Sequence, residues 1–177
     1  MQFDLTNITD QGFVVLPPDR YAVVTTDDWW VRQKEGSDNK IIDVDVKVVA
    51  GNYKDEITRY FHTITNNEQT LGFLLRFLRS VGVIKEGDRG ADGKLVVKFN
   101  FGEKDGRGRV KIKSVMINDQ ERAVAGYKAI AVITEYTDNN TGDKRTSIDR
   151  FEQVDQPVAD AGPAPAATPQ QGSGWPF

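Results

Sequence analysis

Apolar and polar residues alternate along most of the chain, which is the pattern of β-strands with one buried face. Residues 41–49 show it best. One face of that segment would carry Ile42, Val44, Val46 and Val48, and the other Asp43, Asp45 and Lys47. Residues 20–31 and 57–65 are rich in β-branched and aromatic residues. The first third of the chain therefore predicts three strands.

One segment follows a helical period instead. Thr65 and Glu68 have the spacing of a capping box, and Gly82 offers a stop. Between them runs an apolar stripe, Leu71, Leu74, Leu75, Leu78 and Val81. We expect one helix here, with the stripe in the core.

Residues 94–118 predict two more strands, joined by a charged, glycine-rich loop. Residues 128–136 and 144–154 predict an added C-terminal hairpin. The order of three strands, a helix and two strands is that of the OB-fold, a small five-stranded barrel. The sequence thus predicts a mainly β fold: an OB-fold barrel with one helix between its third and fourth strands.

The composition changes near the end of the chain. Residues 157–177 contain five of the seven prolines and five alanines, too little apolar surface to order a segment. We expect a folded domain over residues 1–156 and a disordered tail over residues 157–177. The first residues lack the basic and apolar regions of a secretory signal, and no apolar run approaches the roughly 20 residues of a membrane span. A soluble, cytoplasmic protein is expected.

Positive charge is concentrated in one stretch. The net charge of the protein is −3, yet seven cations and two acids lie between Lys94 and Lys113. Cations on a strand pair can bind a phosphodiester backbone, and Gly106 and Gly108 would let that backbone come close. An ordinary solvated face is the alternative. The proposed DNA-binding cations are Lys94, Lys98, Arg107, Arg109, Lys111 and Lys113.

Sequence-independent binding of single strands also needs aromatic rings, because each stacked base contributes roughly 1–3 kcal/mol. The proposed stacking residues are Trp29, Trp30, Tyr60 and Phe61, and Arg59, which would share a strand face with Phe61, is a further proposed DNA-binding residue. Trp29 and Trp30 are adjacent in a strand and point to opposite faces, so one of them is expected in the core. Barrel packing is the alternative for Tyr60 and Phe61. In the later hairpin, the residues expected in the core are Leu95, Val97, Phe99 and Phe101.

The chain ends in Gly174-Trp175-Pro176-Phe177. With the strand order and the Pro/Gly/Gln tail, this ending resembles single-stranded DNA-binding proteins of bacteria and phages, whose tails end in an acidic stretch and Pro-Phe. Residues 10–13, 16–18 and 50–54 also resemble small bacteriophage proteins thought to serve DNA replication or recombination. The resemblance implies a non-enzymatic, phage-encoded protein of the host cytoplasm that coats single strands. It implies that Trp175, Pro176 and Phe177 bind replication or recombination proteins. In this chain, however, the acid nearest the tip is Asp160.

Two other functions stay open. The same barrel would serve as a protein-interaction or assembly module through Trp29 and Trp30, or as a Mg²⁺-dependent nuclease through Asp43 and Asp45, since hard cations bind carboxylates. The chain has no cysteine and one histidine, His62, which is expected to pack within a strand. We therefore expect no cofactor, no metal and no catalytic residue.

Overall fold

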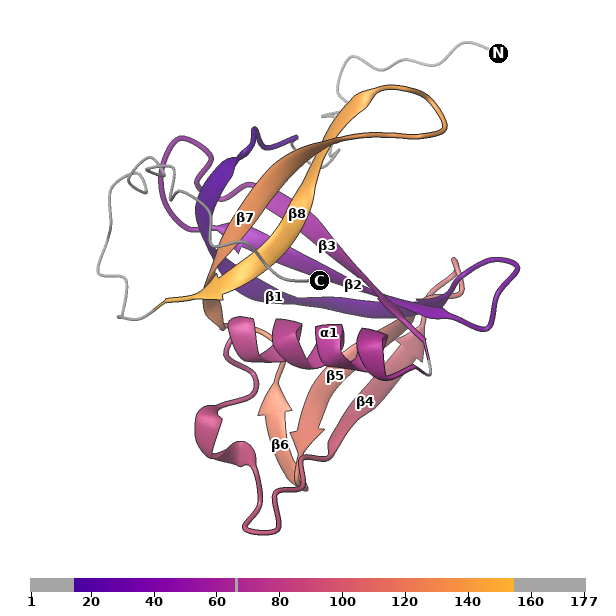
Figure 1. Cartoon of the computed structure of the whole chain (residues 1–177), viewed down its shortest axis with the longest axis vertical. Coiled ribbons are helices and arrows are strands. Elements are labelled where there is room, and N and C mark those ends of the chain that lie inside the picture. The colour runs from indigo at the N-terminus through magenta and orange to yellow at the C-terminus, as the bar shows by residue number, and fades with distance from the viewer. Residues whose placement is uncertain (1–14, 66, 155–177) are drawn as a thin grey trace.

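The computed structural model describes residues 15–65 and 67–154, so the expected tail with Trp175, Pro176 and Phe177 lies outside the described residues. The described part is mainly β with one α-helix (Figure 1). The elements in chain order are β1 (Asp19–Gln33), β2 (Lys40–Val48), β3 (Ile57–Ile64), α1 (Glu68–Ser80), the 3₁₀ turn η1 (Glu86–Asp88), β4 (Val97–Lys104), β5 (Val110–Ile117), β6 (Gln120–Ala123), β7 (Lys128–Thr137) and β8 (Lys144–Gln153).

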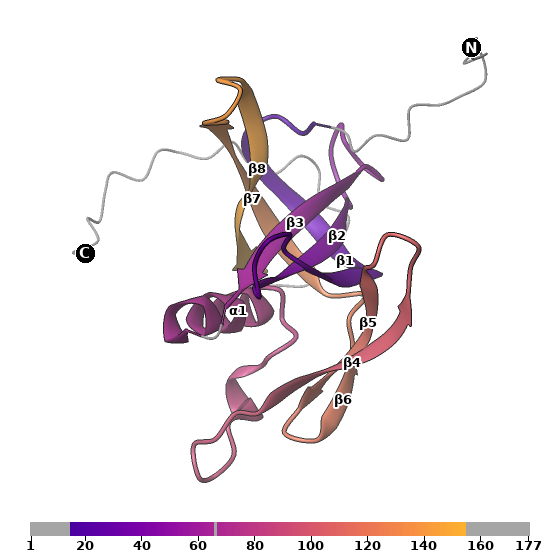
Figure 2. The same cartoon turned by 90° about the vertical axis from the view of Figure 1, so that its right-hand side faces the viewer.

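The long strand β1 organises the sheet. One of its edges pairs with β2, and β2 pairs with β3. The other edge is divided: residues 19–24 pair with β7, and Trp30 and Val31 pair with β5. The strand path is therefore β3-β2-β1-β5-β4, with β6 beside β5 and the β7–β8 hairpin beside the first half of β1. Figure 2 shows the β7–β8 hairpin and the β4–β5–β6 meander leaving β1 in different directions.

The mainly β class and the helix between β3 and β4 are confirmed. Residues 128–154 do form the predicted hairpin, β7–β8, but it pairs with β1 instead of being an addition to the barrel strands. β7 and β8 bury Ala129, Ala131, Ile133, Ile148 and Phe151 in the core. β7 pairs with the first half of β1 and is therefore part of the main sheet. The predicted fourth and fifth strands, β4 and β5, continue the sheet from the second half of β1, with β5 next to β1 and β4 outside it. In the described residues the sheet is open, with no ladder between β3 and β8.

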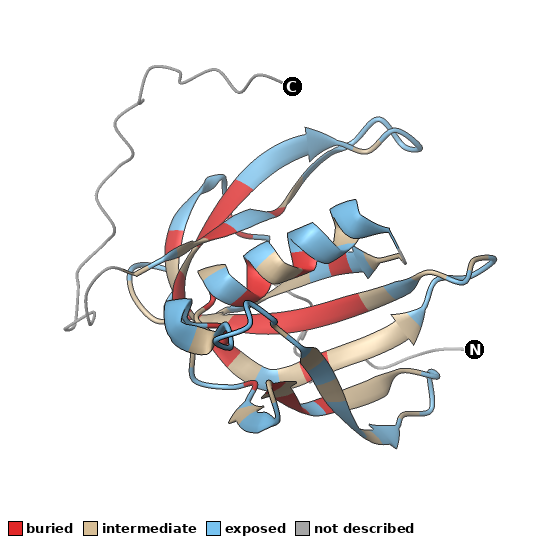
Figure 3. Ribbon diagram, turned by 60° about the horizontal axis from the view of Figure 1, so that its bottom comes forward, coloured by how far each residue is buried: buried red, intermediate tan, exposed pale blue. Residues whose placement is uncertain are grey.

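Helix α1 lies where these two parts of the sheet meet (Figure 1). Its Phe77 ring lies 5.5 Å from Trp29, 4.9 Å from Tyr60 and 5.6 Å from Phe151, measured between ring centroids. One aromatic cluster thus joins β1, α1, β3 and β8 across the open side of the sheet. Figure 3 shows the buried segments gathered around α1, while the ends of the long hairpins are exposed.

The helix differs from its sequence prediction in two details. Asn67, not Thr65, is the N-cap, and its side chain accepts a hydrogen bond of 2.8 Å from the Thr70 amide. The buried face is Leu74, Phe77 and Leu78, while Leu71 is exposed. Gly82 ends the helix with a φ of +85°, which confirms the predicted stop.

β1 contains a bulge. Thr25 pairs with Val46 and Trp29 pairs with Val44, so residues 26–28 stand opposite the single residue Asp45. Thr25 is held inward by its hydroxyl, which donates to the Val124 carbonyl at 2.8 Å. The extra residues turn the middle of the bulge outward, so Thr25 and Trp29 both remain buried.

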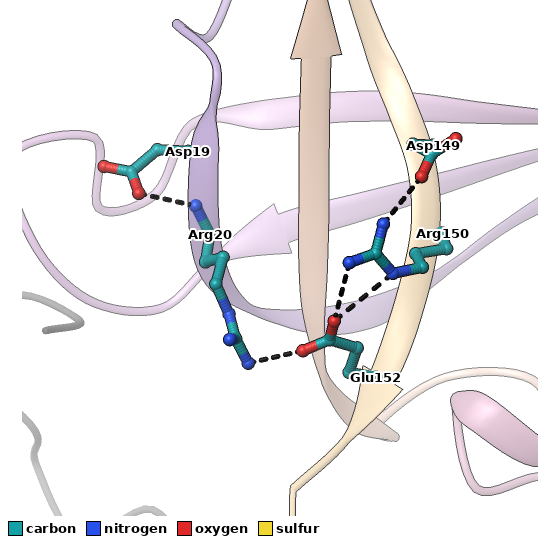
Figure 4. Close-up of polar contacts among 5 residues, drawn as sticks. All are labelled: Asp19, Arg20, Asp149, Arg150 and Glu152. Carbon is teal, nitrogen blue, oxygen red and sulfur yellow. Dashed lines mark hydrogen bonds and ion pairs between the residues drawn. The ribbon is translucent and has the colours of Figure 1, made fainter. Parts of the chain in front are cut away.

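Two sets of ion pairs fix the flanking segments. Arg122 of β6 donates to the Val83 carbonyl at 2.6 Å and to both carboxylate oxygens of Asp88. Hydrogen bonding of the Arg122 guanidinium to the Asp88 carboxylate is the main reason that the pKa of Asp88 lies below its usual value. On the other side of the molecule, Arg20 of β1 pairs with Glu152 of β8, and Arg150 pairs with Glu152 and Asp149 (Figure 4).

Candidate nucleic-acid interface

Four strands each contribute one residue to a single row across the sheet. Phe61 of β3 stands opposite Asp43 of β2, Asp43 opposite Trp30 of β1, and Trp30 opposite Lys111 of β5. Residues directly opposite each other share a face of the sheet. The neighbours Ile42 and Val44 are buried on the other face. The row therefore lies on the outer face, and we call the outer face of β3, β2, β1, β5 and β4 the row face.

The row face presents aromatic surface. Phe61 is 56% exposed. Trp30 is half-buried, and its ring is flanked by the Arg109 guanidinium, 4.7 Å from the ring centroid, and by the Lys111 ammonium at 5.6 Å. Such cation–π contacts hold a ring and its cations together. The structure thus brings together four residues that the sequence nominated separately.

The cations around Trp30 are paired with carboxylates, some of them from outside the cationic stretch of residues 94–113. Arg109 Nε lies 2.8 Å from Asp105, and Lys111 Nζ lies 3.5 Å from Asp27 and 3.6 Å from Asp28. Arg32 Nε donates to Asp43 at 3.1 Å. The arginine, lysine and aspartate charges named here nearly cancel.

Arg59 of β3 is also paired. Its guanidinium donates two hydrogen bonds to the Asp45 carboxylate, one of them 2.7 Å long. The hydrogen bond to Asp45 is the main reason that the pKa of Arg59 is raised. Arg59 and Phe61 share the row face, as the sequence predicted, but this arginine is engaged within the protein.

The β4–β5 meander carries more exposed cations. Lys98 stands opposite Met116, on the side away from the buried Val115 and Ile117, and it contacts Asp119 at 3.6 Å. Lys113 is exposed and lies along Gly102, where an added Cβ would come within 2.6 Å of the Lys113 Cε. Glycine at position 102 therefore lets the lysine lie flat across β4.

The remaining two predicted cations lie at the two ends of the meander. Lys94 precedes β4 and pairs with Asp92 at 3.4 Å, and Arg107 is exposed in the β4–β5 turn. Neither residue is in the row. They extend the charged surface beyond it in opposite directions along β4.

Two of the nominated aromatic residues are not accessible to a base. Trp29, with 0% exposure, packs against Phe77 and is the one tryptophan of the pair that was expected in the core. Tyr60 faces inward, where burial raises its pKa, and its ring stacks on Phe77. Phe101 is exposed rather than buried, because β4 is an edge strand with a register shift on either side of Phe101. Leu95, Val97 and Phe99 are partly buried against the core.

The carboxylates suggested for Mg²⁺ are oriented toward cations. Asp43 and Asp45 are buried and paired with Arg32 and Arg59, so neither faces an open metal site. Among residues 15–65 and 67–154, no cluster of three or more His, Cys, Asp or Glu is placed to hold a metal ion. His62 is packed as predicted: burial lowers its pKa, and Nε2 lies 3.4 Å from the Thr70 carbonyl oxygen.

Sequence reasoning missed two grooves beside α1. One, of about 540 Å³, lies between α1, β3 and β8 and includes Tyr60, Phe73, Arg76 and Phe151. The other, of about 420 Å³, lies between α1 and the start of β4 and is lined by apolar side chains and by Arg89. The exposed Leu71 lines the second groove. The sequence did not indicate this, because Leu71 belongs to the helical stripe that was expected in the core.

Comparison with known proteins assigns no family. No family model matches the chain, and no curated protein matches it significantly. Within the described residues, no helix has the length and apolar character needed to cross a membrane.

Proposed function

We propose that the protein binds single-stranded DNA on the row face, with little dependence on sequence, and serves DNA replication or recombination in a phage-infected cell. The observation that carries the proposal is the row Phe61–Asp43–Trp30–Lys111. Its two aromatic residues are two strand spacings, about 10 Å, apart. Bases stacked on these rings would leave their phosphates near Lys111, Lys113 and Lys98.

We also propose that β1, β2, β3, β7 and β8 are the five strands of an OB-type barrel. The helix follows the third of these strands, as in that fold, and the β4–β5–β6 meander would be an insertion before the fourth. A side-chain contact across the open side supports this proposal: the Tyr60 and Phe151 rings meet edge to face, with centroids 5.1 Å apart. OB-folds bind oligonucleotides on the face of their second and third strands, where Asp43, Asp45, Arg59 and Phe61 lie here.

A binding assay tests the function. A labelled dT oligonucleotide should bind the wild type, with log Kd rising by about 0.7 per log unit of salt for each phosphate contacted. The variant W30A/F61A should bind about 10- to 100-fold more weakly, because it lacks both stacking rings. The matched control is Y136A, which removes an exposed aromatic residue of β7. No binding by the wild type, or an equal loss in the control, would refute the proposal.

The tip Trp175-Pro176-Phe177 is proposed to bind replication or recombination proteins. Deleting residues 172–177 should leave the affinity for dT unchanged or raise it. A large loss of affinity would show that these residues bind DNA and would count against a role in partner recognition.

A second function, a protein-interaction module, is favoured by the near-neutral row face and by the largely apolar groove of about 420 Å³ beside α1. Leu71, Leu74, Leu75 and Leu78 line this groove from the helix, and the opposite side is formed by Leu95, Val97 and Phe99 together with Arg89. Such surfaces often bind partner segments. The same assay separates the two functions, because a protein-interaction module is expected not to bind the labelled single-stranded DNA.

A further inference from the structure

We propose that Asp27 and Asp28, in the β1 bulge, make the interface selective for single-stranded over double-stranded DNA. The inference rests on the proposed function and concerns the same face. Both carboxylates contact the Lys111 ammonium, Asp27 at 3.5 Å and Asp28 at 3.6 Å. The Asp27 side chain is 76% exposed and that of Asp28 is 49% exposed, so both face the solvent from which DNA would approach.

The bulge is what places these acids there. In a regular strand Asp27 would share the inward face of Thr25 and Trp29. Because residues 26–28 stand opposite Asp45 alone, the chain has room to turn Asp27 outward. The Thr26 hydroxyl fixes this turn by donating to the Asp45 carbonyl at 2.8 Å and accepting from the Asp28 amide at 3.2 Å.

The local charge favours discrimination. Lys111 lies beside two carboxylates, and Arg109, the other cation on the Trp30 ring, is held by Asp105. These five side chains sum to one negative charge. A DNA phosphate can therefore contact the Lys111 ammonium only by displacing Asp27 and Asp28. The two displaced carboxylates would stay close enough to repel that phosphate.

A single strand and a duplex respond differently to this arrangement. A single strand offers free base faces to Trp30 and Phe61, and its flexible backbone can follow Lys113 and Lys98, away from the bulge. A duplex keeps its bases stacked inside and carries one negative charge per roughly 1.7 Å of its axis. It receives no stacking and meets more repulsion, so the two aspartates weaken duplex binding more than single-strand binding.

The test compares wild type, D27N/D28N and the control E135Q/D149N. The control makes the same change in net charge on β7 and β8, at residues paired with Lys144 and Arg150. The DNA probes are a labelled dT oligonucleotide and a labelled hairpin duplex, at two salt concentrations. Circular dichroism melting verifies folding. The single variant D27N, at the more exposed position, serves as a second test.

For D27N/D28N we expect affinity for the duplex to rise about tenfold, and affinity for dT to rise no more than about threefold. D27N should show part of this effect, and the control should leave the ratio of the two affinities at its wild-type value. Wild-type binding of dT, with a ratio unchanged in D27N/D28N and D27N, would overturn this inference alone. No binding of dT by the wild type would overturn the proposed function and the inference with it.

Discussion

Asp45 of β2 and Arg59 of β3 stand directly opposite each other and are joined by two hydrogen bonds on the row face. Asp45 is only 7% exposed, although it lies on the side of the sheet opposite the hydrophobic core. A buried carboxylate is stable only when it is paired. Ion pairs thus hold the outer side of β2, and buried valines hold its inner side.

The first prediction follows from this pair. D45N should lower the free energy of unfolding by about 2 kcal/mol, because it weakens charged hydrogen bonds in a buried position. Urea unfolding at pH 7 measures this. D55N is the matched control, because Asp55 pairs with Lys47 at 4.0 Å on the surface and should cost less than about 0.5 kcal/mol. If D45N lowered the free energy of unfolding no more than D55N does, the buried pair would add no more stability than a surface pair.

The second prediction concerns acid stability. Since Arg122 lowers the pKa of Asp88 in the folded protein, this carboxylate stabilises the fold above its unfolded pKa of about 3.9. That contribution is lost as the pH falls through the lower, folded pKa. D88N should therefore be less stable than wild type at pH 6, and the gap should narrow below about pH 4. Urea unfolding between pH 6 and 3 measures it, and a gap independent of pH would refute the linkage.

The third prediction separates the adjacent tryptophans. W29F should lower the free energy of unfolding by about 2 kcal/mol, because it leaves a cavity against Phe77, and should keep the affinity for dT. W30F should do the reverse, with a small effect on stability and a several-fold loss of affinity.

Fluorescence provides an independent measurement of that difference. In a W175F background, dT should quench the emission of Trp30 and leave that of the buried Trp29 almost unchanged. W30F/W175F and W29F/W175F report each residue alone. Strong quenching of Trp29 by dT would contradict its place in the core.

The fourth prediction concerns His62. Burial lowers its pKa in the folded state, so the unfolded chain binds this proton more readily. Stability from the neutral histidine is present above its unfolded pKa of about 6.5 and falls as the pH drops below that value. H62Q should lose less stability than wild type between pH 7 and pH 5. Parallel profiles for the two proteins would contradict this assignment.

Much of the local structure followed from the sequence. The two-residue period of Ile42 to Val48 predicted β2 and its inward face, and the helical period after residue 65 predicted α1. These signals are local, because burial of one face of a strand or helix imposes its own period. Residue type also nominated Trp30, as an aromatic residue, and Lys111, as a cation, and the structure places the two residues opposite each other.

The pairing of distant strands could not be predicted in the same way. Residues 128–136 were recognisable as a strand, but nothing in their pattern identified residues 19–24 as the partner. The local charge of residues 94–113 likewise did not show that Asp27 and Asp28, more than 80 positions before Lys111, would pair with that lysine. The bulge that brings them there depends on contacts of Thr25 with Val124 and Tyr127.

The divided edge of β1 has a consequence for how the molecule comes apart. The β7–β8 hairpin hydrogen-bonds to the beginning of this strand and the β4–β5–β6 meander to its end, so neither has a scaffold once β1 detaches. Denaturation should therefore be one cooperative event with a single midpoint, and amide protons of both regions should exchange through the same global opening.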